Sequence, residues 1–262
     1  MKIFNKIKRI IHSVYKAVIK RKITAFISIL MFLSIFFILL FLISLPNVKD
    51  LLNGIPKTTS MIEYRIKQNK MAGKRIRIRK RWVRFNRIPD LLKRTVIVSE
   101  DINFYTHHGI DFFELKESIK KNFQTGKKSR GGSTITQQLA KNLYLSTKKS
   151  YFRKIKELFI AKKLEKHLSK KRILEIYLNV IEFGHGIFGV ETASEIFFKK
   201  PIDRLKSEEI IRLVSVIPKP LRVSPLSNSK YLKWRANLLI KRLFNVKAIT
   251  KEELIRLKEV FK

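Results

Sequence analysis

The longest apolar run of the chain lies near its N-terminus. Residues 23–45 carry no charged side chain and are rich in Phe, Leu and Ile. A helix rises about 1.5 Å per residue, so this run spans roughly 34 Å and can cross a hydrocarbon core of about 30 Å. A cleaved signal peptide is the alternative, but the run ends Ser44-Leu45-Pro46, without an Ala-x-Ala-like site. We expect a transmembrane anchor.

The flanks of this run suggest how the chain is divided. Residues 1–22 contain eight Lys and Arg and no acidic residue. Basic flanks stay in the cytoplasm, so the N-terminus is predicted to be cytoplasmic and the remainder external. Residues 46–57 carry Pro, Gly and Asn without an apolar period and are predicted to be a linker. Residues 58–262 then form one catalytic domain, long enough for a sizeable core.

Beyond the linker, residues 74–88 alternate basic with apolar side chains. This period of two predicts a half-buried strand or hairpin. Its Arg and Lys can belong to a solvated edge strand that resists aggregation, or they can contact lipid headgroups or a glycan diphosphate. The sequence leaves both interpretations open.

Helical patterns dominate after Leu91. Apolar side chains keep a helical period over residues 151–164 and 173–180. Two capping-box patterns occur: Asp111 with Glu114, ahead of a helix ending near Phe123, and Thr250 with Glu253 near the C-terminus. The sequence therefore predicts a mostly α domain.

The charge balance is strongly basic. The chain has 58 Lys and Arg against 20 Asp and Glu, a formal net charge of +38. This predicts an anionic partner, and nucleic acid, anionic lipid and a phosphorylated substrate all stay open. The absence of Cys excludes disulfides, thiolate metal sites and a Cys nucleophile. The patterns of a phosphate-binding P-loop, a His-Glu-x-x-His zinc site and a complete penicillin-binding acyltransferase are also missing from the sequence.

Acidic residues are scarce in this background, so their positions are informative. Glu100 and Asp101 follow the apolar run 95–98, where a helix gives way to a loop. They can be a cap or salt-bridge partners, or they can supply a general base. Glu157 stands in a basic helix and can be half of an Arg153–Glu157 ion pair or part of a site.

A polar segment between these acids, residues 130–142, suits an anionic sugar ligand. Its glycines allow a turn to approach a ligand, Ser133 or Thr134 can cap the following helix, and a helix N-terminus attracts anions. Two pairs of side chains lie one turn apart on that helix: Gln137 with Lys141, and Gln138 with Asn142. Amides suit sugar hydroxyls and an ammonium suits phosphate, although loops of this composition are common.

Taken in order, four segments resemble the peptidoglycan glycosyltransferase family, glycosyltransferase family 51. The first family motif, Glu-Asp-x-x-Phe-x-x-His-x-Gly, matches Glu100, Asp101, Phe104, His107 and Gly109. The second, Gly-x-Ser-x-x-x-Gln-Gln-x-x-Lys-Asn, matches Gly131, Ser133, Gln137, Gln138, Lys141 and Asn142. The third, Arg-Lys-x-x-Glu, matches Arg153, Lys154 and Glu157, and the fourth runs from Tyr177 and Asn179 through Gly184 to Gly189. Residues 182–191 look most like the monofunctional branch, which lacks a transpeptidase domain.

The resemblance implies a lysozyme-like, mostly α glycosyltransferase domain with a smaller membrane-facing lobe. It would polymerise lipid II into β-1,4 glycan strands, with inversion and release of undecaprenyl diphosphate. The catalytic residues would be Glu100, as general base, and Glu157. Substrate binding would fall to Ser133, Thr134, Gln137, Gln138, Lys141, Asn142, Lys149, Arg153 and Lys156, and the other motif residues would be structural. No metal-ligand cluster is evident in the sequence, so a divalent cation, Mg or Mn, near Glu157 is a hypothesis only.

The implied partners are lipid II, the growing glycan strand, anionic phospholipid and further cell-wall synthesis or division proteins, without nucleic acid. The implied location is the cytoplasmic (inner) membrane, with the domain on the outer or periplasmic face. A helix beginning near Phe112 can rest on that membrane through Phe112, Phe113, Leu115, Ile119 and Phe123, with core packing as the alternative.

Two positions depart from the family pattern. Lys149 stands where Arg is usual, which keeps the charge and loses bidentate phosphate geometry. A usually apolar helix here reads Ser207-Glu208-Glu209-Ile-Ile-Arg212, which bears on how that helix packs. Two other functions compete: a lysozyme-like enzyme that cleaves peptidoglycan, and a non-enzymatic membrane protein that binds anionic lipid or nucleic acid. The first predicts shortened strands, and the second predicts indifference to Glu100.

Overall fold

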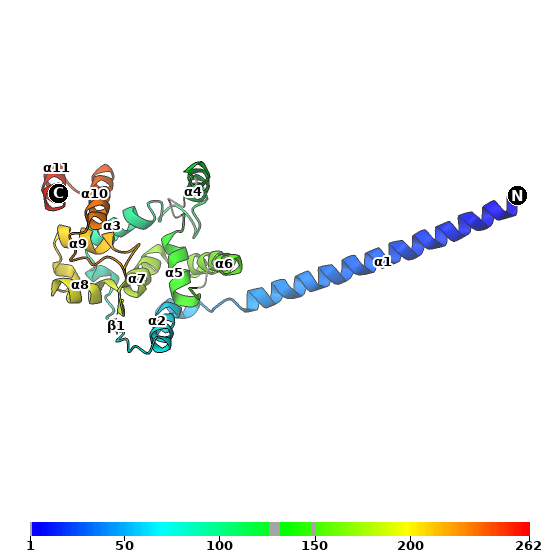
Figure 1. The fold of residues 1–262 in the computed structure, drawn as a ribbon, viewed down its shortest axis with the longest axis horizontal. Helices are drawn as coiled ribbons and strands as arrows, with labels where there is room; N and C mark the ends of the chain where they lie inside the picture. The colour runs from blue at the N-terminus through cyan, green and yellow to red at the C-terminus, as the bar shows by residue number, and fades with distance from the viewer. Residues whose placement is uncertain (1, 126–131, 148–149) are drawn as a thin grey trace. The chain divides into compact units, whose positions relative to one another are not determined.

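The computed structural model describes residues 2–125, 132–147 and 150–262. The chain folds as two separate units, residues 1–46 and 47–262. The first unit is one helix, α1 (Lys2–Ile43) (Figure 1). Its part Ile19–Ile43 is long and apolar enough to cross a membrane. The predicted N-terminal apolar helix is therefore confirmed, and it suggests a single-pass anchor.

The helix α1 ends at Ile43, two residues before the predicted end of the apolar run at Leu45. Ser44 lies in a turn, and its hydroxyl donates to the carbonyl oxygen of Phe41 at 2.7 Å. Pro46 follows closely and has no backbone N–H with which to continue a helix. Apolar side chains of α1 are widely exposed, up to 78% for Ile43, as expected of a surface that lipid would cover.

The second unit is built mostly of α-helices, which confirms the predicted fold class (Figure 1). In chain order they are α2 (Ser60–Met71), α3 (Asp90–Glu100), α4 (Phe112–Thr125), α5 (Ile135–Tyr144), α6 (Tyr151–His167), α7 (Lys170–Val180), α8 (Val190–Phe198), α9 (Ser207–Ser215), α10 (Lys230–Asn245) and α11 (Lys251–Val260). Short 3-10 helices lie between some of them: η1 (Lys49–Leu51), η2 (Phe85–Arg87) and η3 (Ile202–Arg204).

The core forms where α5 packs on α6 and α7, and where α3 packs on α9 and α10. Leu139 of α5, Ile160 of α6, Ile176 of α7, Leu92 of α3 and Leu239 of α10 are fully buried. Each such side chain contributes about 1.5–3 kcal/mol on burial. This packing fixes α3, α5, α7 and α10, the four helices that surround Glu100.

Both helix starts predicted from capping patterns are confirmed. Asp111 accepts the backbone N–H of Glu114 at 2.9 Å at the start of α4, and Thr250 accepts that of Glu253 at 3.2 Å at the start of α11. These side chains satisfy N–H groups that have no partner inside the helix. The helix α4 continues to Thr125, two residues beyond the predicted end.

The predicted strand over residues 74–88 is wrong in extent. Only β1 (Arg79–Lys80) is a strand there, and it pairs in parallel with β3 (Ile187–Phe188). The strand β3 also pairs antiparallel with β2 (Glu182–Gly184), which completes a small sheet of order β1-β3-β2.

Side chains, rather than a neighbouring strand, satisfy the backbone that follows β1. Asn179 accepts the N–H of Val83 at 2.8 Å and donates to its carbonyl oxygen at 2.9 Å. The Thr192 hydroxyl likewise accepts the N–H of Arg81 at 2.7 Å. This backbone therefore needs no hydrogen bonds to a neighbouring strand, although the alternation of basic and apolar residues suggested a strand here.

Candidate active site

Glu100 is the last residue of α3, and three donors among the described residues hold its carboxylate. Its Oε1 accepts the Ser99 hydroxyl at 2.6 Å and the Arg235 Nη2 at 3.3 Å. Its Oε2 accepts the Gln138 Nε2 at 3.1 Å. The Glu100 and Arg235 side chains are 11% and 12% exposed, so this ion pair is poorly screened by solvent.

Gln138 is oriented from its other end. The buried Tyr177 hydroxyl of α7 donates to the Gln138 Oε1 at 3.0 Å, which directs the amide nitrogen towards Glu100. Burial raises the pKa of Tyr177 well above its ordinary value, and Glu100 and Asp101 add to this shift. The phenol therefore keeps its proton and remains a donor. These contacts place Gln138, predicted to bind substrate, directly against the predicted base.

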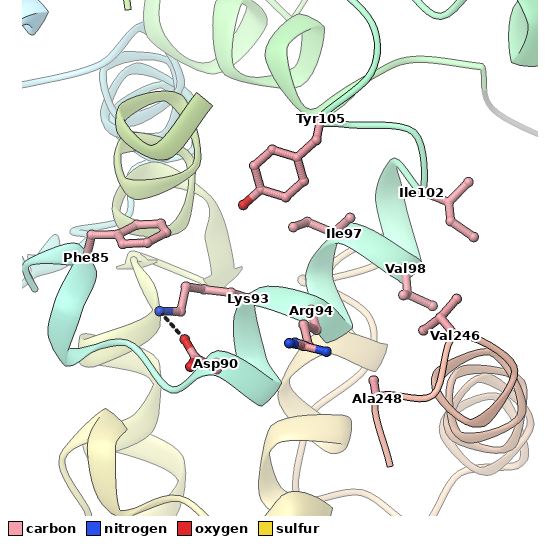
Figure 2. Close-up of a pocket in the computed structure, with 10 residues that line it drawn as sticks. All are labelled: Phe85, Asp90, Lys93, Arg94, Ile97, Val98, Ile102, Tyr105, Val246 and Ala248. Atoms are coloured by element: carbon pink, nitrogen blue, oxygen red, sulfur yellow. Dashed lines mark ion pairs between the residues drawn. The ribbon is translucent and has the colours of Figure 1, made fainter. Parts of the chain in front are cut away.

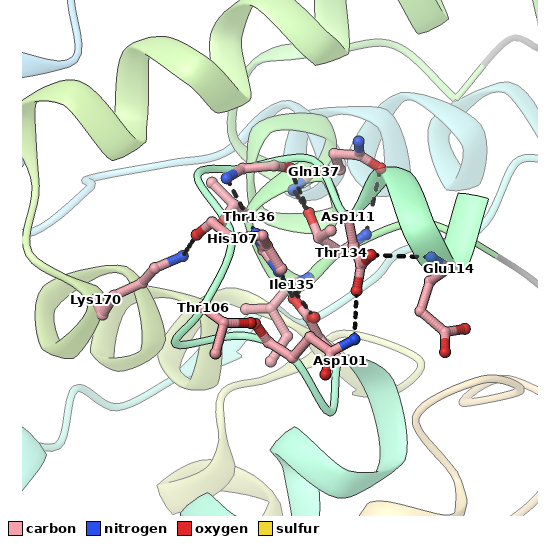
Figure 3. Close-up of polar contacts among 12 residues, drawn as sticks. Asp101, Thr106, His107, Asp111, Glu114, Thr134, Ile135, Thr136, Gln137 and Lys170 are labelled. Atoms are coloured by element: carbon pink, nitrogen blue, oxygen red, sulfur yellow. Dashed lines mark hydrogen bonds and ion pairs between the residues drawn. The ribbon is translucent and has the colours of Figure 1, made fainter. Parts of the chain in front are cut away.

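Asp101, the neighbour of Glu100, organises the loop between α3 and α4 (Figure 3). The Gly109 N–H donates to the His107 Nδ1 at 3.1 Å, which places the imidazole proton on Nε2. That nitrogen lies 2.9 Å from the Asp101 Oδ1, and the Ile135 N–H donates to the Asp101 Oδ2 at 2.9 Å. Asp101 thereby joins the loop to the first turn of α5.

The rest of the first motif also has a structural part. Phe104 is fully buried beneath the Lys170 ammonium, which lies 4.6 Å from the ring centroid. Gly109 adopts a φ of +89°, and a Cβ there would approach the Ala161 carbonyl oxygen to 3.2 Å. The Thr134 hydroxyl donates to the Gly109 carbonyl oxygen at 2.7 Å. The motif thus builds a rigid loop behind Glu100.

Lys141 of α5 is half-buried, and its positive charge interacts with both predicted catalytic glutamates, Glu100 and Glu157. Its ammonium has no hydrogen-bond or ion-pair partner within residues 2–125, 132–147 and 150–262. Burial lowers the pKa of Lys141, Glu157 and Glu100 oppose the shift, and Arg153 and Lys154 add to it. An anionic ligand would relieve the unfavourable burial of this charge.

Glu157 of α6 has a different environment from Glu100. It is buried, and its oxygens accept the Arg153 Nη1 at 2.8 Å and the Lys154 ammonium. Lys154 also donates to the Ser133 hydroxyl at 2.9 Å, which links α6 to the start of α5. The Arg153 Nε is buried without an acceptor in the described part of the chain. Lys156 is half-buried on the same helix.

Several predicted binding residues are engaged by the protein itself. Thr134 and Gln137 are buried and form a capping box at the start of α5. Asn142 is buried further along that helix. The predicted role of these three residues in substrate binding stays a prediction. Gly131 and Lys149 lie outside the described residues.

The fourth motif forms the turn after α7. Asn179 makes the contacts with Val83 described above, and Gly184 ends β2. Gly189 has a φ of +83°, and a Cβ there would come within 2.7 Å of the Asn179 carbonyl oxygen. A side chain is therefore excluded at Gly189, and the chain can turn tightly into α8.

Comparison with known proteins identifies the family of the chain. A family model described as Transglycosylase matches residues 68–244. The chain belongs to the transglycosylase family. One relative, the biosynthetic peptidoglycan transglycosylase of Neisseria gonorrhoeae, is 39% identical over 188 residues, 72% of this chain and 81% of that protein. The protein of the same name from Aromatoleum aromaticum is 44% identical over 167 residues, 64% of this chain and 73% of that protein.

These matches confirm the family and the enzyme class predicted from the four motifs, a peptidoglycan glycosyltransferase. A crystal structure of penicillin-binding protein 1A from Haemophilus influenzae is similar with a TM-score of 0.41 and 20% identity, over 69% of this chain and 17% of that chain. The lysozyme-like arrangement of two lobes stays a prediction.

Two partners of the transglycosylase carboxylate were missed in the sequence. Arg235 is 135 residues from Glu100 in the sequence and belongs to none of the four motifs. Ser99 directly precedes Glu100 but was not among the predicted site residues. No spacing rule connects α10 with the end of α3. Only the basic, amphipathic character of residues 230–245 could have drawn attention to Arg235.

The unusual polar helix α9 packs normally. Ile210, Ile211 and Val214 are buried, while Glu209 accepts the Lys200 ammonium at 2.7 Å and the Lys206 N–H at 2.8 Å. Arg212 donates to the carbonyl oxygens of Pro225 and Ser227 at 3.2 and 3.0 Å. The charged residues therefore have local partners, and the apolar face stays in the core.

An open cavity of about 500 Å³ lies along α3 (Figure 2). Its lining includes Phe85, Lys93, Ile97 and Tyr105, and the Lys93 ammonium is paired with Asp90 at 2.6 Å. Burial raises the pKa of Tyr105. The lining contains neither glutamate of the predicted site, so this cavity supplies no catalytic carboxylate.

Proposed function

We propose that Glu100 is the general base of a peptidoglycan polymerase that joins lipid II to a growing glycan strand. The carboxylate would take the proton of the acceptor 4-hydroxyl as that oxygen attacks the donor anomeric carbon. The bond to the lipid diphosphate breaks with inversion. The observation that carries this proposal is the fixed carboxylate: the three donors that the described residues supply leave a lone pair on Oε2 for the acceptor hydroxyl.

Charge for the departing diphosphate would come from α5 and α6. Lys141 has no hydrogen-bond or ion-pair partner among the described residues, and Arg153 and Lys156 carry further positive charge on α6. Cations fixed before the reaction stabilise developing negative charge more than mobile solvent does. Glu157 would act by holding Arg153 and Lys154 in place, rather than by exchanging a proton.

The hypothesis of a divalent cation beside Glu157 fits poorly with the surrounding residues. Both carboxylate oxygens already have cationic partners, and the described residues contain no cluster of three His, Asp or Glu that could hold a metal ion. A cation would have to displace Arg153 or Lys154. We therefore assign no step to a metal, and polymerisation in the presence of excess chelator is expected to continue.

The membrane would hold both the anchor and the substrate. We place the N-terminus in the cytoplasm and residues 47–262 on the outer or periplasmic face, because the basic residues precede the apolar helix. On α4, Phe112, Phe113 and Phe123 are 68%, 69% and 91% exposed, which favours contact with lipid over core packing. Anionic phospholipid would be attracted by the basic charge, and contacts with other cell-wall proteins are left to experiment.

Vesicle binding tests the role of α4. A fragment of residues 47–262 should bind anionic vesicles at low salt, and the double change Phe112→Ser and Phe113→Ser should weaken that binding. No binding by the unaltered fragment even at low salt would contradict the membrane contact.

Product analysis tests the function itself. The full chain in detergent should convert lipid II into long strands with release of lipid diphosphate. Shortened strands from added peptidoglycan, without polymer, would instead support the cleaving alternative. Equal activity in Glu100→Gln and the unaltered protein would support neither enzyme mechanism.

A further inference from the structure

Two aromatic side chains stand together on the exposed side of α10. Trp234 is 59% exposed and Tyr231 is half-buried. Their ring centroids are 5.8 Å apart, with the planes tilted by 47°. Single exposed aromatic residues are common on protein surfaces, but two rings in contact present a larger and more rigid face.

A cation completes this surface from another part of the chain. The Lys219 ammonium lies 4.1 Å from the centroid of the Tyr231 ring. Lys219 sits between Pro218 and Pro220 in the turn that follows α9, so its backbone has little freedom. We name Lys219, Tyr231 and Trp234 the aromatic platform.

The aromatic platform is continuous with the site of Glu100. Tyr231 and Arg235 are four residues apart on α10 and therefore lie on one face of the helix. The Arg235 guanidinium is the group that pairs with Glu100. Burial raises the pKa of Tyr231, Arg235 opposes the shift, and Glu100 adds to it, as expected if the phenol is close to both charges.

We propose that the aromatic platform binds a sugar ring of the glycan strand beside the catalytic carboxylate. The inference rests on the proposed function, and it adds a binding subsite that none of the four motifs contains. The C–H face of a pyranose packs on the electron-rich face of an aromatic ring, while the Lys219 ammonium can donate to sugar hydroxyls. Ligand sites combine such aromatic walls with a few polar groups.

A membrane surface is the competing occupant, because Trp and Tyr are also common at lipid interfaces. Position favours the sugar. The aromatic platform shares a helix face with the partner of Glu100, whereas the exposed phenylalanines on α4 offer lipid a purely apolar surface. The indole N–H and phenol also give this surface hydrogen-bonding groups that α4 lacks at those positions.

Tryptophan fluorescence measures binding directly. The chain has two Trp, and Trp82→Phe leaves Trp234 as the reporter. In the full chain in detergent, a soluble β-1,4 tetramer of N-acetylglucosamine should change this fluorescence saturably. Tyr231→Ala should weaken that binding about tenfold, in line with the loss of one aromatic contact. Brominated lipid that quenches Trp234, with no response to the tetramer, would overturn the proposal in favour of the membrane.

Kinetics supply a second readout. Trp234→Ala should raise the KM for lipid II about tenfold and change kcat little, while Phe244→Ala, another exposed aromatic residue on α10, should change neither. An unchanged KM in Trp234→Ala together with unchanged tetramer binding in Tyr231→Ala refutes the subsite. Glu100→Gln separates the two proposals, because it should lower polymerisation about 10²- to 10⁴-fold and retain tetramer binding. Normal polymerisation without tetramer binding would leave the proposed function intact and remove only the subsite.

Discussion

The two glutamates predicted to be catalytic lie in contrasting surroundings. Glu100 meets two neutral donors and one guanidinium at the junction of α3, α5 and α10. Glu157 is buried on α6, and its two partners in the described part of the chain are cations from the preceding turn of the same helix. A carboxylate that accepts a proton needs a free lone pair. A carboxylate that is paired with two cations neutralises their charge and holds them in place. The difference agrees with the proposal that Glu100 is the base and that Glu157 holds neighbouring cations in place.

The largest effect should follow Glu100→Gln. The amide keeps the volume and most hydrogen bonds but cannot accept the proton, so polymerisation should fall about 10²- to 10⁴-fold with the fold retained. Lipid II turnover and thermal unfolding should be measured on the same sample. The matched control is Glu63→Gln, since Glu63 is exposed on α2. Near-normal turnover in Glu100→Gln would mean that the carboxylate is structural.

Glu157→Gln should act on stability first. It removes the buried anion from Arg153, whose side chain is 17% exposed, and breaking such a pair costs about 3 kcal/mol. Lys154 is more exposed, 41% of its side chain, and can turn towards solvent at little cost. Denaturant unfolding should show the loss. Full stability combined with a loss of turnover as large as that of Glu100→Gln would erase the distinction between the two glutamates.

Lys141→Ala should lower turnover about 10²-fold, the effect of removing one fixed electrostatic contact from a transition state. Lys154→Ala should lower it less, because Lys154 is already engaged by Glu157 and Ser133. Both variants should be assayed at one ionic strength, since salt screens these charges. Equal losses would show that the positive charge acts diffusely.

The pH dependence should report on Lys141 as well. Burial lowers the pKa of its ammonium, so the positive charge is present at low pH and is lost, as pH rises, earlier than in a free lysine. Turnover should fall on the alkaline side for this reason. Lys141→Arg keeps its charge and should move that fall to higher pH. An alkaline limb that does not move in Lys141→Arg assigns the titration to another group.

The smallest effect is expected at Arg235. Arg235→Met removes a charged hydrogen bond that positions Glu100, and kcat should fall about tenfold with KM for lipid II little changed. Arg235→Lys should restore part of the rate, because it returns the charge without the planar guanidinium. Arg242→Lys on the same helix is the control. A fall in stability without any change in kcat would give Arg235 a purely structural part.

Local patterns predicted much of the secondary structure. The caps at Asp111 and Thr250 are visible in sequence because each acts within three residues, and the structure bears out both. The alternation over residues 74–88 led to a wrong strand prediction. It shows how side chains alternate, but not which groups form hydrogen bonds with the backbone. The partners after β1 are Thr192 for Arg81 and Asn179 for Val83, which are distant in sequence and could not be inferred from the period.

The sequence by itself determined the apolar N-terminal helix, the mostly α domain and, through four ordered motifs, the family of enzyme. These properties depend on hydrophobic period, on capping and on residue spacing over short stretches of chain. Which side chains surround Glu100 was decided only by the tertiary structure. Gln138 and Arg235 reach the Glu100 carboxylate, and Tyr177 orients Gln138, because the core packs their three helices together. Packing of this kind is set by contacts between distant segments, which a local pattern does not contain.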